Sequence, residues 1–131
     1  MSGTPLVRKL GFKAGQRIFV SGIPESYFEW IHPIPAEIKF EDEISGTFEV
    51  AHIFGTDWET VEDQILALQP HLPRNGSIWI SWPKKSANIP CDISGQDIRQ
   101  WLKTTEWVDV KVCSINDIWT ALKIMIRKEL R

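Results

Sequence analysis

The sequence has few of the residues from which catalytic and metal sites are usually built. It contains two cysteines, three histidines and one tyrosine in 131 residues, with no GxSxG motif and no glycine-rich loop. The possible zinc ligands lie far apart, without the close pairs that zinc sites show, at His32, His52, His71, Cys91 and Cys113. We therefore expect no metal site, two free thiols and no nucleophilic cysteine. His52 stands on the apolar face of a predicted strand, as a hydrogen-bonded core histidine would.

Long apolar runs are also absent. No run approaches the roughly 18 residues that a membrane span needs. The first ten residues, MSGTPLVRKL, lack the apolar segment of a secretory signal. We therefore expect a cytoplasmic protein that does not interact with membranes.

The overall composition is that of an ordinary globular protein. The chain is 43% hydrophobic and 11% aromatic, and its seven tryptophans are an unusually high number. It has no repeats, low-complexity tracts or long linkers. These features predict one domain that spans residues 1–131.

The acidic residues are concentrated in one segment. Residues 24–63 contain eleven acids and one base, Lys39, whereas the rest of the chain contains fourteen bases and six acids. The net charge of -2 thus conceals a segment at -10 and a remainder at +8. Such segregation favours association with a protein partner or with a second copy, and the lack of a dense basic run argues against nucleic-acid binding.

Strand and helix patterns alternate along the chain. Apolar runs or alternation predict buried strands over 17–20, 48–54 and 77–82. Thr56 and Glu59 fit a capping box ahead of an amphipathic helix, and Ser94 and Asp97 fit a second one. This order is typical of an α/β domain with a mostly parallel sheet.

The remaining segments predict smaller elements and a different ending. Short helices are expected after Thr4, as N-cap, and over 27–31, while the acidic stretch 37–44 is at most a short strand. Alternation over 108–126 predicts a C-terminal antiparallel hairpin, whose first strand carries Val108, Val110 and Val112 on one face.

The first predicted strand, with its flanks AGQRIFVSG, and the element order around it resemble methyltransferase-type Rossmann domains. The resemblance implies a reduced version of that fold, at least one strand-helix unit short. The turn after the strand has one glycine, Gly22, followed by Ile23 and Pro24. Because proline lacks an N–H and isoleucine disfavours positive φ, we do not expect the usual glycine-rich cradle, and we predict no cofactor.

A second resemblance covers nearly the whole chain. The segments SGTPLVRKLGFKAGQR (2–17), WISWPKKS (79–86) and DVKVCSINDIWTALKIMIRKE (109–129) are similar to a small bacterial family of uncharacterised, StaR-like proteins. In that family the SGTPL, WPKK and KVCxIxxxWxxLKxxxRKE motifs recur together. The resemblance implies a fold but no catalytic residues.

The candidate site lies where the predicted strands end. Trp82, Lys84 and Lys85 follow the strand over 77–82, and Gly22 follows the first strand. Open α/β sheets bind ligands outside the carboxyl ends of their strands, and two lysines would favour an anionic small molecule. The other interpretation is that Pro83 merely ends the strand and both lysines lie in solvent. The acidic run over 41–43 is similarly more typical of a solvated face than of a carboxylate site.

Two functional hypotheses remain open on the sequence alone. The leading one is a non-catalytic binding or regulatory protein whose charge segregation guides association. The alternative is a degenerate methyltransferase-like enzyme, or a binder of a small anionic ligand at Gly22, Trp82, Lys84 and Lys85. No catalytic constellation decides between them.

Overall fold

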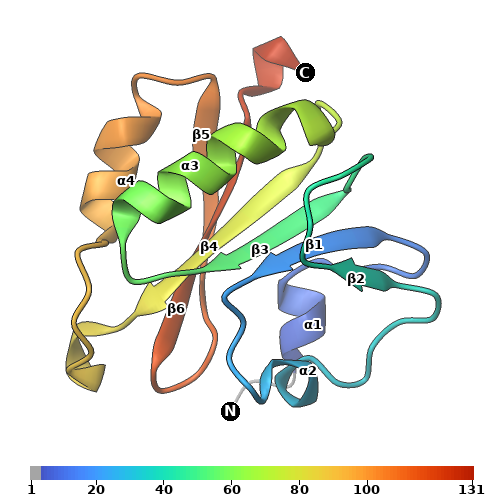
Figure 1. Ribbon diagram of the computed structural model, residues 1–131, viewed down its shortest axis with the longest axis horizontal. Coiled ribbons are helices and arrows are strands. Elements are labelled where there is room, and N and C mark those ends of the chain that lie inside the picture. Colours follow the sequence, from blue (N-terminus) through green and yellow to red (C-terminus); the bar gives the residue numbers. More distant parts are fainter. Residues whose placement is uncertain (1–3) are drawn as a thin grey trace.

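The protein is an α/β structure built on one mostly parallel sheet, seen in a computed structural model that describes residues 4–131. The strands of the described residues are β1 (Arg17–Ser21), β2 (Lys39–Glu41), β3 (Val50–Phe54), β4 (Ser77–Pro83), β5 (Trp107–Ser114) and β6 (Trp119–Ile126). They lie side by side in the order β2-β1-β3-β4-β6-β5 (Figure 1). The first four are parallel to one another, and β6 and β5 form the antiparallel hairpin. The predicted fold class is confirmed.

The helices differ widely in length. They are α1 (Leu6–Lys9), α2 (Tyr27–Trp30), α3 (Trp58–Leu68) and α4 (Gly95–Leu102), with short 3-10 segments η1 (Gln69–His71), η2 (Lys85–Ala87) and η3 (Lys128–Leu130). Among residues 4–131, no helix is long and apolar enough to cross a membrane. Figure 1 shows α3 crossing in front of the strands, with α4 beside it.

The helices begin close to the predicted N-caps, although α1 and α3 each begin one residue later than predicted. Ser94 caps α4 by accepting a hydrogen bond from the Asp97 N–H at 3.1 Å, as predicted. The cap of α3 is Asp57 rather than Thr56, because the Asp57 carboxylate accepts from the Thr60 N–H at 2.9 Å. Helix α1 begins after Pro5, one residue later than predicted. Ser2 and Gly3 of the SGTPL motif lie outside the described residues.

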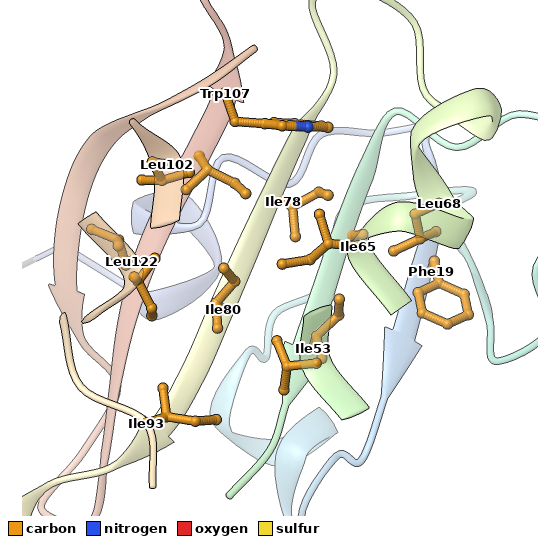
Figure 2. Packing of buried hydrophobic residues seen from close by; sticks show 14 of the residues in the cluster. Phe19, Ile53, Ile65, Leu68, Ile78, Ile80, Ile93, Leu102, Trp107 and Leu122 are labelled. Carbon is orange, nitrogen blue, oxygen red and sulfur yellow. The ribbon is translucent and has the colours of Figure 1, made fainter. Parts of the chain in front are cut away.

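The central strands of the sheet are buried on both faces, each face under its own set of side chains. Strands β3 and β4 are buried along their whole length, so consecutive residues pack on opposite sides. On one face, Ile65 and Leu68 of α3 pack against the strands in an apolar cluster (Figure 2). This is the α3/α4 face, with Phe19, Ile53, Ile78, Ile80, Leu102 and Leu122 among its residues. The opposite, α1/α2 face contains Ile18, Val50, Tyr27, Phe54 and Trp79.

The hairpin departs from the predicted alternation. A bulge between Asp109 and Lys111 shifts the register of β5 against β6. Val110 and Val112 are consequently exposed, whereas Cys113 is buried. The predicted common face of Val108, Val110 and Val112 is therefore wrong, because a bulge inserts one extra residue and reverses the side on which later residues point.

Candidate functional site

A large hollow lies at the carboxyl ends of β1 and β2. We call it the carboxyl-end pocket. Its volume is about 750 Å³, and its lining includes Gly22, Ile23, Phe28, Phe40 and the acidic residues 41–43. Because β1 and β2 are parallel, the loops that follow them leave the sheet at the same edge. The pocket is therefore where an open α/β sheet places a ligand.

Gly22 lies beside the point where the strand order reverses. The chain runs from β1 to β2 on one side, and β3 then occupies the other side of β1. Gly22 has φ +65°, and a Cβ added to it would come within 2.4 Å of the Phe54 carbonyl oxygen. Only glycine fits, because both the conformation and the close approach of β3 exclude a side chain. The glycine is thus required by the backbone itself.

The acidic wall of the pocket has one fixed carboxylate and two exposed ones. Glu41 forms an ion pair with Arg17, which also donates to the carbonyl oxygens of Ser45 and Thr47. The hydrogen bond from Arg17 lowers the pKa of Glu41. Asp42 and Glu43 are exposed, and neither forms an ion pair within residues 4–131. The pocket therefore carries a negative potential.

A buried chain of hydrogen bonds lies beneath the pocket. The Tyr27 hydroxyl is 2.9 Å from His52 Nδ1, and His52 Nε2 is 2.7 Å from Ser81 Oγ. All three side chains are fully buried. Burial lowers the pKa of His52 to about 3 and raises that of Tyr27, so both groups are neutral at pH 7.

The three hydrogen-bonded side chains affect the shape of the pocket through packing rather than by contact with a ligand. A neutral imidazole has one N–H, so His52 donates one of its two hydrogen bonds and accepts the other. The bonds tie α2 to β3 and β4. Phe28 continues the connection, because its ring packs edge-on against Tyr27 at 5.4 Å and against Phe40 at 5.0 Å between centroids. The prediction of a hydrogen-bonded core histidine is confirmed.

The predicted lysines line a different pocket, at the end of β4. This β4-end pocket has a volume of about 270 Å³ and is lined by Lys84, Lys85, Cys91, Asp92, Ser94 and Asp97, among others. Lys84 is also tied to the hairpin, since its Nζ donates to Ser114 Oγ at 2.8 Å and its N–H to the Ile118 carbonyl at 2.7 Å. The pocket has carboxylates as well as lysines.

The structure therefore divides the four residues of the predicted site. Gly22 lines the carboxyl-end pocket, and Lys84 and Lys85 line the β4-end pocket. Trp82 is buried in the cluster on the α3/α4 face, with its ring 3.6 Å from where a Cβ on Gly95 would stand. Strand β3 stands between the ends of β1 and β4.

Sequence reasoning missed the acidic wall of the carboxyl-end pocket. The run 41–43 follows the second strand, and Glu41 comes about 20 residues after Gly22, which is the spacing at which Rossmann sheets place a ribose-binding carboxylate. That spacing could have identified Glu41 as a candidate pocket residue from the sequence. The partners of His52 left no such signal, because Ser81 reaches it through the pairing of β4 with β3 and Tyr27 through the packing of α2 on the sheet.

The described residues offer no metal centre, and one of the two thiols is buried. Within residues 4–131, no three His, Cys, Asp or Glu side chains gather closely enough to hold a metal ion. Cys91 and Cys113 are free thiols. Burial raises the pKa of Cys113, so its sulfur is protonated and a poor nucleophile at neutral pH.

Comparison with known proteins finds similarity in structure and not in sequence. No protein-family model matches the chain, and no curated protein sequence matches it. A ribosomal protein methylase from Lactobacillus delbrueckii subsp. bulgaricus is similar, with a TM-score of 0.57 and 14% identity over 92% of this chain and 74% of that one. The chain has a methyltransferase-type Rossmann fold.

Two further solved structures agree. A magnesium protoporphyrin IX methyltransferase from Synechocystis PCC 6803, solved with bound SAM, has a TM-score of 0.59 and 11% identity over 93% of this chain and 76% of that one. A SAM-dependent methyltransferase from Aquifex aeolicus has a TM-score of 0.59 and 11% identity over 93% and 88% of the two chains. Identities this low show a shared fold alone.

Proposed function

We propose that this chain is a degenerate methyltransferase-like protein that binds an adenosyl ligand in the carboxyl-end pocket, with no catalytic group of its own. The observation that carries the proposal is an open pocket of about 750 Å³ at the carboxyl ends of β1 and β2, walled by carboxylates and by Phe28 and Phe40. The magnesium protoporphyrin IX methyltransferase of the same fold was solved with bound SAM. Pocket position and wall chemistry together favour this class of ligand.

The wall residues suit the adenosine part of such a ligand. Phe28 and Phe40 offer aromatic faces and edges to an adenine ring. Asp42 and Glu43 are free to accept hydrogen bonds from ribose hydroxyls, whereas Glu41 is held by Arg17. The negative potential attracts the sulfonium charge of S-adenosylmethionine.

The same pocket has a poor cradle for the rest of the ligand. After Gly22 come Ile23 and Pro24, so one backbone N–H that could hold a carboxylate is missing. The pocket wall contains no histidine, cysteine or lysine, and Glu41, one of the carboxylates that could serve as a general base, is held by Arg17. We therefore infer binding without methyl transfer.

Calorimetric titration with S-adenosylmethionine and S-adenosylhomocysteine tests this function. We expect both to bind, and S-adenosylmethionine to bind more tightly at low salt, because only it carries the sulfonium charge. Phe28→Ala should weaken binding on the order of tenfold through lost stacking, and Asp42→Asn should reduce the preference for S-adenosylmethionine. Asp97→Asn, in the β4-end pocket, is the matched control. Absence of binding by either compound at millimolar concentration would refute the proposal.

A second candidate function follows from the distribution of charge. The acidic segment 24–63 contains β2, at one edge of the sheet, whereas the hairpin of β5 and β6 forms the other edge, and residues 107–131, which include it, contain five bases and three acids. Opposite charge at opposite edges favours association with a charged protein partner or head-to-tail self-association. Sedimentation at low and high salt tests it, because such association weakens steeply with ionic strength. A salt-independent monomer at high protein concentration would refute self-association.

An anionic ligand at the predicted lysines stays a proposal, now confined to the β4-end pocket for Lys84 and Lys85. Thermal-shift measurements with nucleotides and phosphorylated metabolites test it. Stabilisation that disappears in Lys85→Gln would support it. The proposed relationship to the StaR-like family implies no site residue in either pocket.

A further inference from the structure

A third pocket lies at the opposite end of the sheet from the carboxyl-end pocket. Ser77, the first residue of β4, pairs with Met125, and Trp107 pairs with Ile126. Trp107 and Ile126 therefore stand at the amino ends of the parallel strands. Together with Leu66 of α3, Leu72, Arg74 and Glu106, they line a pocket of about 400 Å³, which we call the amino-end pocket.

Trp107 brings an unpaired hydrogen-bond donor to this pocket. Its side chain is 2% exposed, and its Nε1 has less than 1 Å² of exposed surface and no hydrogen-bond partner within residues 4–131. Other indole groups of the chain are paired: Trp79 Nε1 donates to the Leu10 carbonyl at 2.9 Å, and Trp101 Nε1 to Glu62 at 2.8 Å. Buried donors in proteins are rarely left unpaired, so this one calls for an acceptor.

The indole lies at the end of the apolar cluster on the α3/α4 face. Figure 2 shows the Trp107 ring beside Ile78, with its nitrogen on the side away from Leu102. That side of the ring faces the part of α3 that carries Leu68. The last turn of α3 also supplies Leu66 to the amino-end pocket. Trp107, a wall residue of this pocket, thus has its donor on the side of the ring away from Leu102.

The other wall residues define what the pocket accepts. Leu66, Leu72 and Ile126 supply apolar surface, and Leu66 is 52% exposed. Arg74 and Glu106 form a loose ion pair of 3.9 Å, so the two charges cancel. A volume of about 400 Å³ lies in the range of small-molecule sites. The wall therefore favours an uncharged, largely apolar molecule.

We propose that the amino-end pocket binds a small apolar molecule with a carbonyl oxygen, which accepts the hydrogen bond of Trp107 Nε1. Because Nε1 is closed to solvent, this hydrogen bond requires a side chain of the pocket wall to turn aside before the carbonyl can reach it. The site is independent of the proposed adenosyl pocket, since the two lie at opposite ends of the parallel strands.

Two planar isosteres, acetophenone and α-methylstyrene, test the proposal on the whole chain. They differ in having C=O or C=CH2 at the same position. The indole ¹H–¹⁵N resonance of Trp107, assigned by its loss in Trp107→Phe, should move with acetophenone in a saturable manner. Acetophenone should bind about fivefold more tightly than α-methylstyrene, and the preference should fall to about onefold in Trp107→Phe.

A surface variant covers the case in which Trp107→Phe fails to fold. Leu66→Ala removes exposed apolar wall without entering the core and should weaken acetophenone binding severalfold. Ile118→Ala, an exposed apolar residue at the other end of the sheet, should leave it unchanged. Equal affinity for the two isosteres, an unmoved Trp107 resonance, or equal effects of Leu66→Ala and Ile118→Ala would each overturn the proposal.

Discussion

The two faces of the sheet are held by different kinds of interaction. On the α3/α4 face, helices of 11 and 8 residues carry side-chain caps and pack through an apolar cluster. On the α1/α2 face, two four-residue helices have no side-chain caps. There the hydrogen bonds of Tyr27, His52 and Ser81, and of Trp79 with the Leu10 carbonyl, join helix to strand.

This difference shows what short helices need in order to be positioned. A four-residue helix is unstable by itself and buries little apolar surface, so directional bonds must fix its place. The carboxyl-end pocket has Phe28 of α2 in its wall. The shape of the proposed adenosyl pocket therefore depends on the face that polar bonds hold.

The largest expected effect is loss of apolar packing on the α3/α4 face. Ile65→Ala removes a fully buried side chain of α3 and should cost about 3 kcal/mol of unfolding free energy, as cavity-forming substitutions do. Ile31→Ala, equally buried next to α2, should cost about 2 kcal/mol because a short helix can settle into the space. Urea denaturation measures both, and a larger cost for Ile31→Ala would break the comparison.

Acid should weaken the α1/α2 face selectively. The pKa of His52 falls from 6.5 to about 3 on folding, so the unfolded chain binds the proton first and stability is lost as pH drops below 6.5. The loss should be about 2 kcal/mol between pH 7 and pH 5. Denaturation at several pH values in His52→Gln should show a shallower slope over that window. Identical slopes in the wild type and in His52→Gln would contradict the assignment.

Removal of the Tyr27 hydroxyl should distinguish the contribution of the buried hydrogen bonds to stability from that of apolar packing. Tyr27→Phe keeps the ring but leaves His52 Nδ1 without its partner, at a cost of about 1–2 kcal/mol. In a double-mutant cycle, Tyr27→Phe should cost much less when His52 is already leucine. Additive losses would show that the two side chains are not coupled.

The smallest expected effect concerns the helix caps. Serine is the N-cap residue of both α4 and α2, so the two faces can be compared by the same substitution. Ser94→Ala should cost about 1 kcal/mol, because the Ser94 hydroxyl accepts the Asp97 N–H at the start of α4. Ser26→Ala at the same position of α2 should cost close to nothing, since the Ser26 side chain makes no cap bond. Thermal denaturation compares the two, and equal costs would contradict the structure.

Much of the fold was predictable because its signals are local. Ser94 and the spacing of apolar residues predict α4, and the alternation over 48–54 predicts a central strand. The cap of α3 was misplaced because Thr56 and Asp57 both suit the position, and only the fold selects Asp57. The bulge near Val110 also left no local mark, since it depends on how β5 pairs with β6.

The candidate site was harder to predict because it depends on strand order. Gly22 and Lys84 both follow strand ends, but β3 lies between β1 and β4, so they line separate pockets. The acidic residues 41–43 resemble a solvated face in sequence. The spacing of Glu41 after Gly22 hints at their place in a pocket wall, and the pairing of β2 with β1 establishes it.

The close packing around Gly22 predicts the result of a selection experiment. If every position were randomised and variants were chosen only for folding, glycine would still be recovered here, because the Phe54 carbonyl leaves no space for a Cβ. Its persistence in such a library would record the architecture of the sheet. A library selected for binding of the proposed ligand would instead retain Asp42 and Glu43, which are exposed and form no ion pair within residues 4–131.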